Sequence, residues 1–295
     1  MDTLASRLRA GLQGAEDTPA LGAVGDDAAV RWLSRVALRR RLAARCAWLR
    51  HQGLGRGDVC LLALPSTLDC AELTLAAYLL GAVPLLVAPP LIQGTHSGLR
   101  QVLLGAARRA RPRLALCDPS LAVDAGALRR AGRGTRVVLE VPAGEEGEAK
   151  LPDAPQAAPE EIAGMQLTSG TTRAPRICVW SHRGVLAALD GMAAAMALGE
   201  GDVCVNWTPL YHDMGLVNNL LLCVARGVPL AMMTPQQFVK RPALWPRALA
   251  AAGATVSWSP NFGFALAARA TERELAGVRL DRVRALYNAA ERIHP

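Results

Sequence analysis

The sequence predicts an α/β fold of two lobes, each a mostly parallel β-sheet flanked by helices. Hydrophobic residues fill 51% of the 295 positions, enough for a packed core and too many for a disordered chain. Short apolar runs alternate with stretches of helical periodicity, which is typical of parallel sheets with crossover helices. An acidic, proline-rich stretch interrupts this alternation, so we predict a first lobe at 1–141, a linker at 142–160 and a second lobe at 161–295.

The first lobe is expected to contain a helix at 30–52, where apolar residues recur with helical spacing against an arginine-rich face. The run 59–64 is apolar throughout and ends at Pro65, as expected of a buried parallel strand. Ser66 and Thr67 can cap the helix that follows. The remaining expected elements are a helix at 68–80, a strand at 83–87, a helix at 98–109, a strand at 114–117, a second arginine-rich helix and a strand at 137–139.

The second lobe continues the alternation of strands and helices. Strands are expected at 165–167, 177–180, 203–207, 229–233, 255–257 and 284–287, and helices at 183–196, 216–225, 242–251 and 262–270. The last strand is followed by only a few residues and by no closing helix. We therefore expect the second lobe to be truncated.

Composition argues against several classes of protein. The net charge of +8 comes from 31 arginines and two lysines that are spread along helical stretches, and aromatic residues are only 4%, which leaves little for base stacking. Arginine clusters such as 108–113 are interpreted as solvated helix faces. No apolar run is long enough to span a membrane, and the N-terminus lacks the apolar core of a secretory signal. Seven cysteines show no metal-site spacing. We expect a cytoplasmic protein with no nucleic-acid partner, no membrane span and no metal site within this chain.

The first segment with a chemical signature is Thr168–Arg176, which reads TSGTTRAPR between two expected strands. Hydroxyls and backbone N–H groups can donate to phosphate oxygens, glycine permits close approach, and a guanidinium neutralises charge. The segment lacks the GK[ST] of a Walker loop. A Ser/Thr-rich turn explains the same composition, so both interpretations stay open.

Three further segments each follow an expected strand. His212 and Asp213 come after the strand at 203–207, at the strand end where ligands bind in open α/β sheets, although Asp213 as a helix cap beside an incidental histidine is the alternative. The stretch 257–266 suits the wall of an apolar pocket or ordinary helix–sheet packing. The stretch 286–291, taken alone, is explained by a strand that ends in a loop.

Taken together and in this order, the segments resemble the adenylate-forming superfamily of acyl-CoA synthetases, peptide-synthetase adenylation domains and luciferases. Within it they are most similar to fatty acyl-AMP ligases. The superfamily loop reads TSG[ST]TGxPKG where this chain has TSGTTRAPRI, and the arginine at Arg173 is a habit of the fatty acyl-AMP ligases. Also similar are Ser181-His182, PLYHDMGL at 209–216, MTPQQFVKRPALW at 233–245 and ATVSWSPNFGFAL at 254–266.

The resemblance implies a reaction in which a fatty acid carboxylate attacks the α-phosphate of ATP to give an acyl-adenylate and pyrophosphate. The acyl group then passes to the phosphopantetheine thiol of an acyl carrier protein in polyketide or lipopeptide biosynthesis. Such catalysis rests on positioning and charge neutralisation. The implied catalytic residues are Thr168, Thr172, Arg176 and His212; the implied nucleotide- and phosphate-binding residues are Thr168, Ser169, Gly170, Thr171, Thr172, Asn288, Ala289, Ala290 and Glu291; the implied acyl-binding residues are Trp207, Met214, Gly215, Asn261, Phe262 and Gly263.

Three departures from the family pattern qualify this expectation. Ile177 and Ala289 stand where relatives have glycine, and the chain ends before the segment that would carry a magnesium-linked glutamate, a ribose-binding aspartate and a mobile domain with a catalytic lysine. ATP and Mg²⁺ are the expected cofactors, with the Mg²⁺ ligand beyond the chain end, and this fragment is expected to be inactive alone. Two alternatives stay open: an acyl-CoA or aryl-CoA ligase, and a non-catalytic, degenerate adenylation-like domain that binds acyl chains or docks a partner.

Overall fold

The structure is a computed structural model that describes residues 2–89, 96–144, 147, 150–168 and 175–293. By their contacts the residues form two compact units. The first unit comprises 1–9, 39–65 and 69–188, and the second comprises 10–38, 66–68 and 189–295. The strands of the described residues form two six-stranded sheets flanked by helices, which confirms the predicted fold class.

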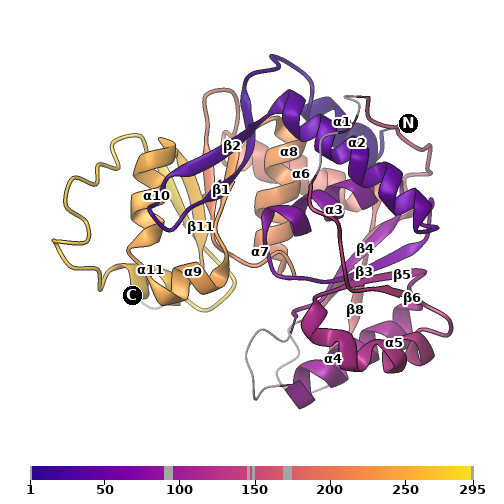
Figure 1. The fold of residues 1–295 in the computed structure, drawn as a ribbon. Coiled ribbons are helices and arrows are strands. Elements are labelled where there is room, and N and C mark those ends of the chain that lie inside the picture. Colours follow the sequence, from indigo (N-terminus) through magenta and orange to yellow (C-terminus); the bar gives the residue numbers. More distant parts are fainter. Residues whose placement is uncertain (1, 90–95, 145–146, 148–149, 169–174, 294–295) are drawn as a thin grey trace. The chain divides into compact units, whose positions relative to one another are not determined.

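The sheet of the first unit has the strand order β6-β5-β3-β4-β7-β8. All of its strands except β7 are labelled in Figure 1. Neighbouring strands are parallel, except that β8 pairs antiparallel with β7. The strands are β3 (Val59–Ala63), β4 (Val83–Leu86), β5 (Leu114–Cys117), β6 (Arg136–Val138), β7 (Ile162–Leu167) and β8 (Ile177–Ser181).

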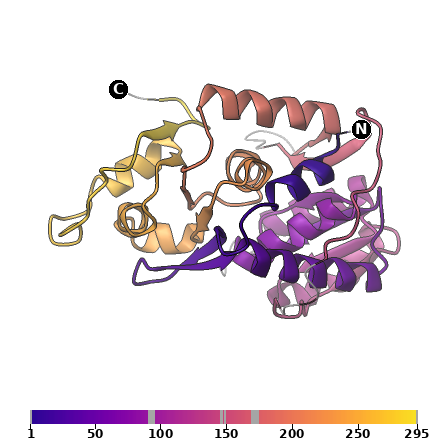
Figure 2. The same cartoon turned by 90° about the horizontal axis from the view of Figure 1, so that it is seen from above.

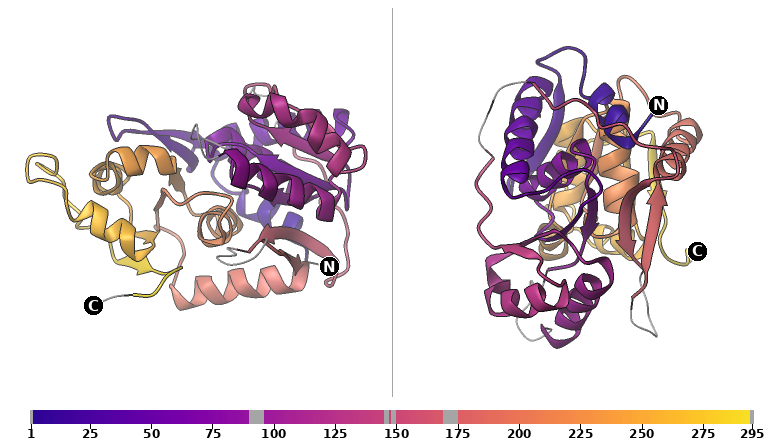
Figure 3. Two further views of the ribbon diagram at one scale, coloured as in Figure 1. Left: turned by 90° about the horizontal axis from the view of Figure 1, so that it is seen from below. Right: turned by 90° about the vertical axis from the view of Figure 1, so that its right-hand side faces the viewer.

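One face of this sheet is covered by α4 (His96–Ala110) and α5 (Ala125–Ala131), which lie side by side (Figure 3). A 3₁₀ turn, η1 (Pro119–Asp124), leads into α5, and the side chain of Asp118 accepts a hydrogen bond from its Ser120 N–H. Leu103 of α4 and Leu128 of α5 pack against Leu61 and Ala115 of the central strands. On this face, apolar side chains of β3 and β5 therefore pack with those of α4 and α5 in a single hydrophobic core.

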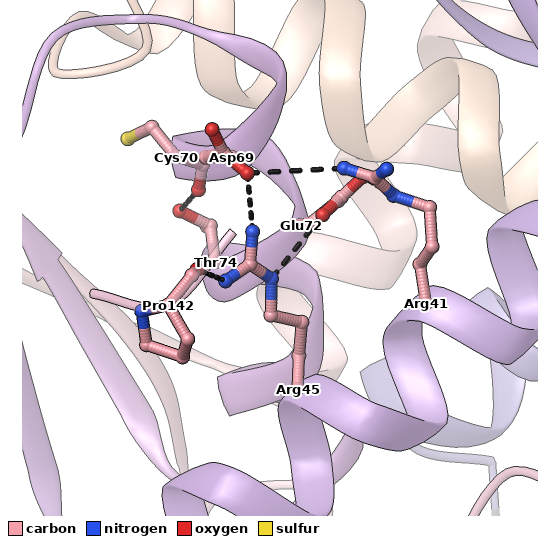
Figure 4. Close-up of polar contacts among 7 residues, drawn as sticks. All are labelled: Arg41, Arg45, Asp69, Cys70, Glu72, Thr74 and Pro142. Atoms are coloured by element: carbon pink, nitrogen blue, oxygen red, sulfur yellow. Dashed lines mark hydrogen bonds and ion pairs between the residues drawn. The ribbon is translucent and has the colours of Figure 1, made fainter. Parts of the chain in front are cut away.

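A buried ion-pair cluster in the first unit joins α2 (Arg35–His51) to α3 (Leu68–Leu79) (Figure 4). Glu72 accepts hydrogen bonds from Arg41 Nε at 2.5 Å and from Arg45 Nε at 3.2 Å. Arg45 also donates to Asp69 and to the carbonyl oxygen of Pro142. The cluster thus ties the segment that follows β6 to both helices.

The sheet of the second unit has the order β12-β11-β9-β10-β1-β2, parallel apart from β1 with β2. Its last strand, β12, lies at the edge of the sheet (Figure 2). The strands are β1 (Pro19–Val24), β2 (Val30–Ser34), β9 (Cys204–Asn206), β10 (Leu230–Met232), β11 (Val256–Ser259) and β12 (Ala285–Asn288), and the helices are α7 (Asp213–Gly215), the π-helix η2 (Leu216–Leu221), α8 (Leu222–Arg226), α9 (Pro235–Lys240), α10 (Leu244–Ala252) and α11 (Asn261–Ala267). Four helices have residues in both units: α2 and α3, described above, together with α1 (Leu4–Gly11) and α6 (His182–Ala195).

The division into units differs from the predicted boundaries at 141 and 161. The residues that follow the expected linker form β7 and β8, and β7 pairs with β4 in the first sheet. Conversely, β1 and β2 lie near the start of the chain but join the second sheet, where β1 pairs with β10. A polar, proline-rich composition identifies a surface segment, whereas strand pairing depends on long-range contacts that composition does not contain.

The predicted helix at 30–52 is wrong over its first turn and correct afterwards. Val30–Ser34 is strand β2, and the helix begins at Arg35. The residues at 30, 33 and 36 fit a helical period, yet 30–33 are also strand formers once a partner is present. That partner is β1, which the sequence did not suggest, and α9 was likewise not expected.

Candidate functional site

The direction of winding of the second sheet reverses at β9. The chain passes from β9 to β10 on one side of it, then to β11 on the other side, with β12 beyond β11. In open α/β sheets, ligands bind outside the carboxyl ends of the strands at such a reversal. The segments 207–215, 260–263 and 289–291 follow the carboxyl ends of β9, β11 and β12, so they lie at this edge of the sheet.

The loop after β9 is held by side-chain hydrogen bonds to its backbone. Asn206 Oδ1 accepts from the Thr208 N–H at 2.9 Å and from the Thr208 hydroxyl at 2.6 Å, and Asn206 Nδ2 donates to the Thr208 carbonyl at 2.9 Å. Ser66 Oγ accepts from the Leu210 N–H at 2.9 Å. Asn206 and Thr208 are buried, so the loop begins from a fixed, fully paired turn.

His212 and Asp213 form an adjacent pair in this loop. His212 Nδ1 lies 2.7 Å from Asp213 Oδ1 and 3.3 Å from the Met214 amide nitrogen, while that amide also donates to Asp213 Oδ1 at 2.8 Å. The shorter contact favours a protonated Nδ1 that donates to the carboxylate, which leaves Nε2 for a ligand. The hydrogen bond with Asp213 raises the pKa of His212 against the opposing effect of burial, and the same bond lowers the pKa of Asp213.

The helix that follows starts in close contact with the loop. A Cβ atom on Gly215 would lie 2.2 Å from the Pro209 carbonyl oxygen, so only glycine fits there without movement. Downstream, Leu216–Leu221 forms a π-helix instead of the regular helix predicted at 216–225. The buried Asn219 donates from Nδ2 to the Met214 carbonyl at 2.7 Å and accepts from Cys204 Sγ at 3.2 Å. Such π turns are frequent at functional sites.

An aromatic layer lies next to the carboxyl end of β9. Trp207 stacks on Phe238, with ring centroids 3.9 Å apart, and makes an edge contact with Phe262 at 5.7 Å. A Cβ atom on Gly263 would lie 2.5 Å from Trp207 Cζ2, so α11 starts directly against the indole ring. Trp207 is 2% exposed and its Nε1 has no hydrogen-bond partner among the described residues, whereas Phe262 is 47% exposed. Three of the predicted acyl-binding residues are therefore in mutual contact.

The segments after β11 and β12 are joined to each other by hydrogen bonds. Asn288 Nδ2 donates to Asn261 Oδ1 at 3.0 Å, and Glu291 Oε1 accepts from the Phe262 N–H at 2.7 Å. Between them, Ala290 has a φ of 74°, a left-handed conformation that costs energy for a residue other than glycine. Asn288 Oδ1 is buried without a partner among the described residues. Two hydrogen bonds therefore link the predicted nucleotide-binding residues at 288–291 to the predicted acyl-binding residues at 261–263.

In the first unit, the predicted phosphate loop closes the β7–β8 hairpin. Thr168 N–H donates to the Arg176 carbonyl at 2.8 Å, and Arg176 N–H donates to Thr168 Oγ1 at 3.0 Å. Arg109 Nη2 donates to the Pro175 carbonyl at 2.6 Å. The side chain of Arg176 is exposed. Ser169, Gly170, Thr171 and Thr172 lie outside the described residues.

Sequence reasoning missed three contributors to these two sites. Phe238 supports Trp207 from α9, Asn206 shapes the loop before His212, and Arg109 reaches the base of the hairpin from α4. Arg109 was assigned to a solvated helix face and is exposed, but its hydrogen bond to the Pro175 carbonyl could not be expected from the sequence. Among the described residues no group of three His, Cys, Asp or Glu side chains could hold a metal ion, and no helix there is long and apolar enough to cross a membrane.

Comparison with known proteins gives the family. Residues 9–295 match the family model of the AMP-binding enzymes. The chain is 35% identical over 172 residues to a 4-hydroxyphenylalkanoate adenylyltransferase of Mycobacterium marinum, covering 56% of this chain and 28% of that protein. It is 38% identical over 138 residues to a probable long-chain-fatty-acid–AMP ligase of Mycobacterium tuberculosis, covering 44% and 24%.

A solved structure shares the fold over almost the whole chain. The fatty acyl-adenylate ligase of L. pneumophila, in complex with acyl adenylate and pyrophosphate, superposes with a TM-score of 0.82 at 21% identity. The superposition covers 98% of this chain and 50% of that protein, so the chain spans about half the length of this relative. The match over residues 9–295, together with the motifs described above, shows that the chain belongs to the AMP-binding enzyme family of adenylate-forming proteins.

Proposed function

We propose that this protein is a fatty acyl-AMP ligase, which activates a fatty acid with ATP. A carboxylate oxygen of the acid attacks the α-phosphorus, the bond from that phosphorus to the bridging oxygen breaks, and pyrophosphate leaves. Family membership and the names of the relatives support this activity. Because the aligned regions cover less than a third of the curated relatives' length, the activity is proposed for the protein as a whole.

The observation that carries the proposal is the convergence of three loops at the reversal of the second sheet. The loops after β9, β11 and β12 bring the His212 imidazole, an aromatic wall at Trp207 and Phe262, and a polar segment at 288–291 to one edge. In the proposed roles, His212 stabilises the negative charge shared by the carboxylate and the α-phosphate, which is where preorganised charge lowers a barrier most.

The other roles follow from the chemistry of each segment. We assign Asn288–Glu291 to the adenine, with the unpartnered Asn288 Oδ1 as an acceptor for a donor of the base. Trp207, Met214, Gly215 and 261–263 line the start of the acyl site in this proposal. Thr168–Thr172 and Arg176 are assigned to the phosphates. The described residues contain no group of three His, Cys, Asp or Glu side chains that could hold a metal ion, and no step is assigned to Mg²⁺.

The fate of the acyl group is also part of the proposal. An acyl-adenylate is a mixed anhydride that a thiol can attack, and we propose the phosphopantetheine thiol of an acyl carrier protein as the acceptor.

We also propose that the protein works in a reducing compartment such as the cytoplasm. All seven cysteines of the chain are free thiols, and Cys178 is exposed, which supports this proposal.

The proposal is tested by pyrophosphate exchange into ATP with medium- and long-chain fatty acids, on this chain and on any longer natural form that contains it. Exchange that depends on both fatty acid and ATP supports the function. Binding of a non-hydrolysable acyl-adenylate analogue without exchange in any form would instead identify a degenerate, acyl-binding domain, an outcome that Ile177 and Ala289 make worth testing. A product assay that offers CoA and carrier protein in competition separates the ligase classes.

A further inference from the structure

A carboxylate from the segment after β12 holds the start of α11. Glu291 Oε1 accepts from the Phe262 N–H at 2.7 Å, although 29 residues separate the two in the sequence. Pro260, at the N-cap position of the helix, makes no side-chain hydrogen bond to its first turn. A charged acceptor binds a backbone N–H more strongly than a neutral one does. Glu291 therefore supplies the cap that the neighbouring sequence of α11 does not.

The same contact holds the Glu291 segment in an unfavourable conformation. Ala290 has a φ of 74°, in the left-handed region. A residue other than glycine stays in that region only where the surrounding contacts hold it there. Here the bond to Glu291 holds one side, and the bond from Asn288 Nδ2 to Asn261 Oδ1 at 3.0 Å holds the other. If the Glu291 bond opens, the backbone at Ala290 is free to relax.

The residue that Glu291 holds belongs to the aromatic wall of the proposed acyl site. The Phe262 side chain is 47% exposed, and its ring makes an edge contact with Trp207 at 5.7 Å. The next residue, Gly263, is so close to Trp207 that a Cβ atom there would lie 2.5 Å from Cζ2. A shift of the first turn of α11 would therefore move the Phe262 ring relative to Trp207 and change the shape of that wall.

We propose that Glu291 is a positioning residue that couples the acyl site to the nucleotide site. The bond between Glu291 and Phe262 is closed in one state of the protein and open in another. An acyl chain that packs on Phe262 favours the closed state, and so does a nucleotide that is bound by 288–291. Each ligand then raises the affinity for the other by the same factor. The inference rests on the proposed function for the assignment of the two ligands to these segments.

The coupling is tested by calorimetric titration of the 295-residue chain with dodecanoate, in the absence and in the presence of saturating adenosine. Adenosine has no phosphate, so charge repulsion between the two ligands does not enter the result. We expect adenosine to tighten dodecanoate binding about fivefold or more, which is a typical size for coupling between two sites. An unchanged dodecanoate Kd, or no binding of either ligand, overturns the proposal.

Variants of Glu291 separate coupling from a direct contact with the nucleotide. Glu291→Ala should weaken dodecanoate binding about fivefold even without adenosine, as expected for the loss of one capping hydrogen bond, and should abolish the effect of adenosine on it. Glu291→Gln keeps an acceptor but not the charge, so it should retain part of the effect. If Glu291→Ala weakens adenosine binding but leaves its effect on dodecanoate intact, Glu291 is a nucleotide contact alone and the coupling role is wrong.

Glu274 provides a matched control. Its Oε2 also accepts a backbone N–H, from Thr271 at 2.9 Å, at an exposed turn outside the two proposed sites. Glu274→Ala should leave dodecanoate binding and its response to adenosine unchanged. A loss equal to that in Glu291→Ala would show a general effect of removing a surface carboxylate and would overturn the assignment to Glu291.

The contact itself is measured by amide hydrogen exchange. Glu291→Ala should speed exchange of the Phe262 amide, whereas Glu274→Ala should not; an unchanged rate in Glu291→Ala overturns the positioning role. Coupled binding of dodecanoate and adenosine without pyrophosphate exchange in any form would support the inference and refute the ligase activity. Pyrophosphate exchange together with uncoupled binding would do the reverse.

Discussion

Arg45 Nε lies 3.2 Å from Glu72 Oε2 inside the first unit, with 2% of the Arg45 side chain and none of the Glu72 side chain exposed. Removing two charges from water is costly, and their attraction repays this only when the remaining donors and acceptors are also paired. Here they are, because Arg41 binds the other oxygen of Glu72 and Arg45 reaches both Asp69 and the Pro142 carbonyl (Figure 4). Each charged side chain in the cluster therefore depends on the others for its hydrogen-bond partners.

Glu72→Gln should therefore destabilise the chain strongly. Glutamine has the shape of glutamate but removes the buried negative charge that Arg41 and Arg45 share, so that only the half-exposed Asp69 still pairs with Arg45, and breaking a buried pair in this way costs about 3–5 kcal/mol. Urea unfolding followed by circular dichroism measures the loss. Asp281→Asn is the control, since its pair with Arg279 is 67–80% exposed and should contribute less than about 1 kcal/mol. Equal effects of the two substitutions would contradict this account.

Acid should weaken the second unit partly through Asp202. Burial alone would raise the pKa of this carboxyl, but hydrogen bonds from Arg284, Thr255 and the Gly199 amide lower it to about 2. A folded-state pKa below the unfolded value of 3.8 stabilises the protein above about pH 4, and the benefit is lost as the pH falls toward 2. Its size is at most about 2 kcal/mol. Asp202→Asn should flatten the unfolding free energy over this range, and an unchanged slope would show that Asp202 is not responsible.

His212→Ala should separate activity from stability. His212 is half-buried and makes local contacts, so its loss should cost about 1 kcal/mol or less in unfolding free energy. If it stabilises the developing charge, adenylate formation should fall about 10²–10³-fold. Melting temperature and exchange rate are measured side by side on an active form of the protein. A fall in activity that only tracks the folded fraction would make His212 a structural residue.

Asp213→Asn should lower the pKa of His212. The carboxylate is the main cause of the raised value, and an amide in its place cannot hold the imidazolium by charge. Proton NMR titration of the His212 ring reports the pKa directly. His182 is an internal reference, because its pKa is lowered by burial and it accepts the Leu4 N–H far from Asp213 in the sequence. A His212 pKa that stays raised would mean that another group holds the proton.

Two glycines should respond to alanine in opposite directions. At Gly215 the new methyl group would meet the Pro209 and Thr208 carbonyl oxygens at 2.2 and 2.6 Å, and that loop is fixed by its own hydrogen bonds, so we expect a loss of about 1–3 kcal/mol or more. Gly191 lies within α6 with nothing near its Cβ position, so alanine there should stabilise by about 0.5–1 kcal/mol. The same sign at both positions would contradict the packing described for α7.

Local patterns predicted most elements, and long-range pairing explains the differences. The runs at 59–64 and 114–117 are strands because continuous apolar residues need cover on both faces, and the structure gives both of them a neighbouring strand on each side. The strand at 30–34 was taken for helix because its partner lies in a segment, 19–24, with no strand-like alternation of its own. Strand order, which creates the reversal at β9, is absent from any local pattern.

The candidate site shows the same limit. Motif resemblance named Asn261, Asn288 and Glu291, but their mutual hydrogen bonds depend on β11 and β12 being neighbours. Arg108 and Arg109 are both exposed at a basic helix end, and the sequence does not show that Arg109 is the one that donates to the Pro175 carbonyl. Contacts between residues far apart in the sequence can be identified only once the fold is known.

The wide turn at Leu216–Leu221 makes the placement of His212 depend on the length of the chain as well as its composition. A regular helix advances by about 100° per residue, and a π turn takes up an additional residue within the helix. Because the π turn absorbs this residue, deleting one residue from 216–221 would permit an ordinary helix in which the His212–Met214 loop and α8 keep nearly the same angle to each other. What the wide turn adds is the position of Asn219, whose side chain binds both the Met214 carbonyl and Cys204. Without that position, the Met214 carbonyl would lose this donor, and the end of the loop that carries His212 would lose its tie to β9.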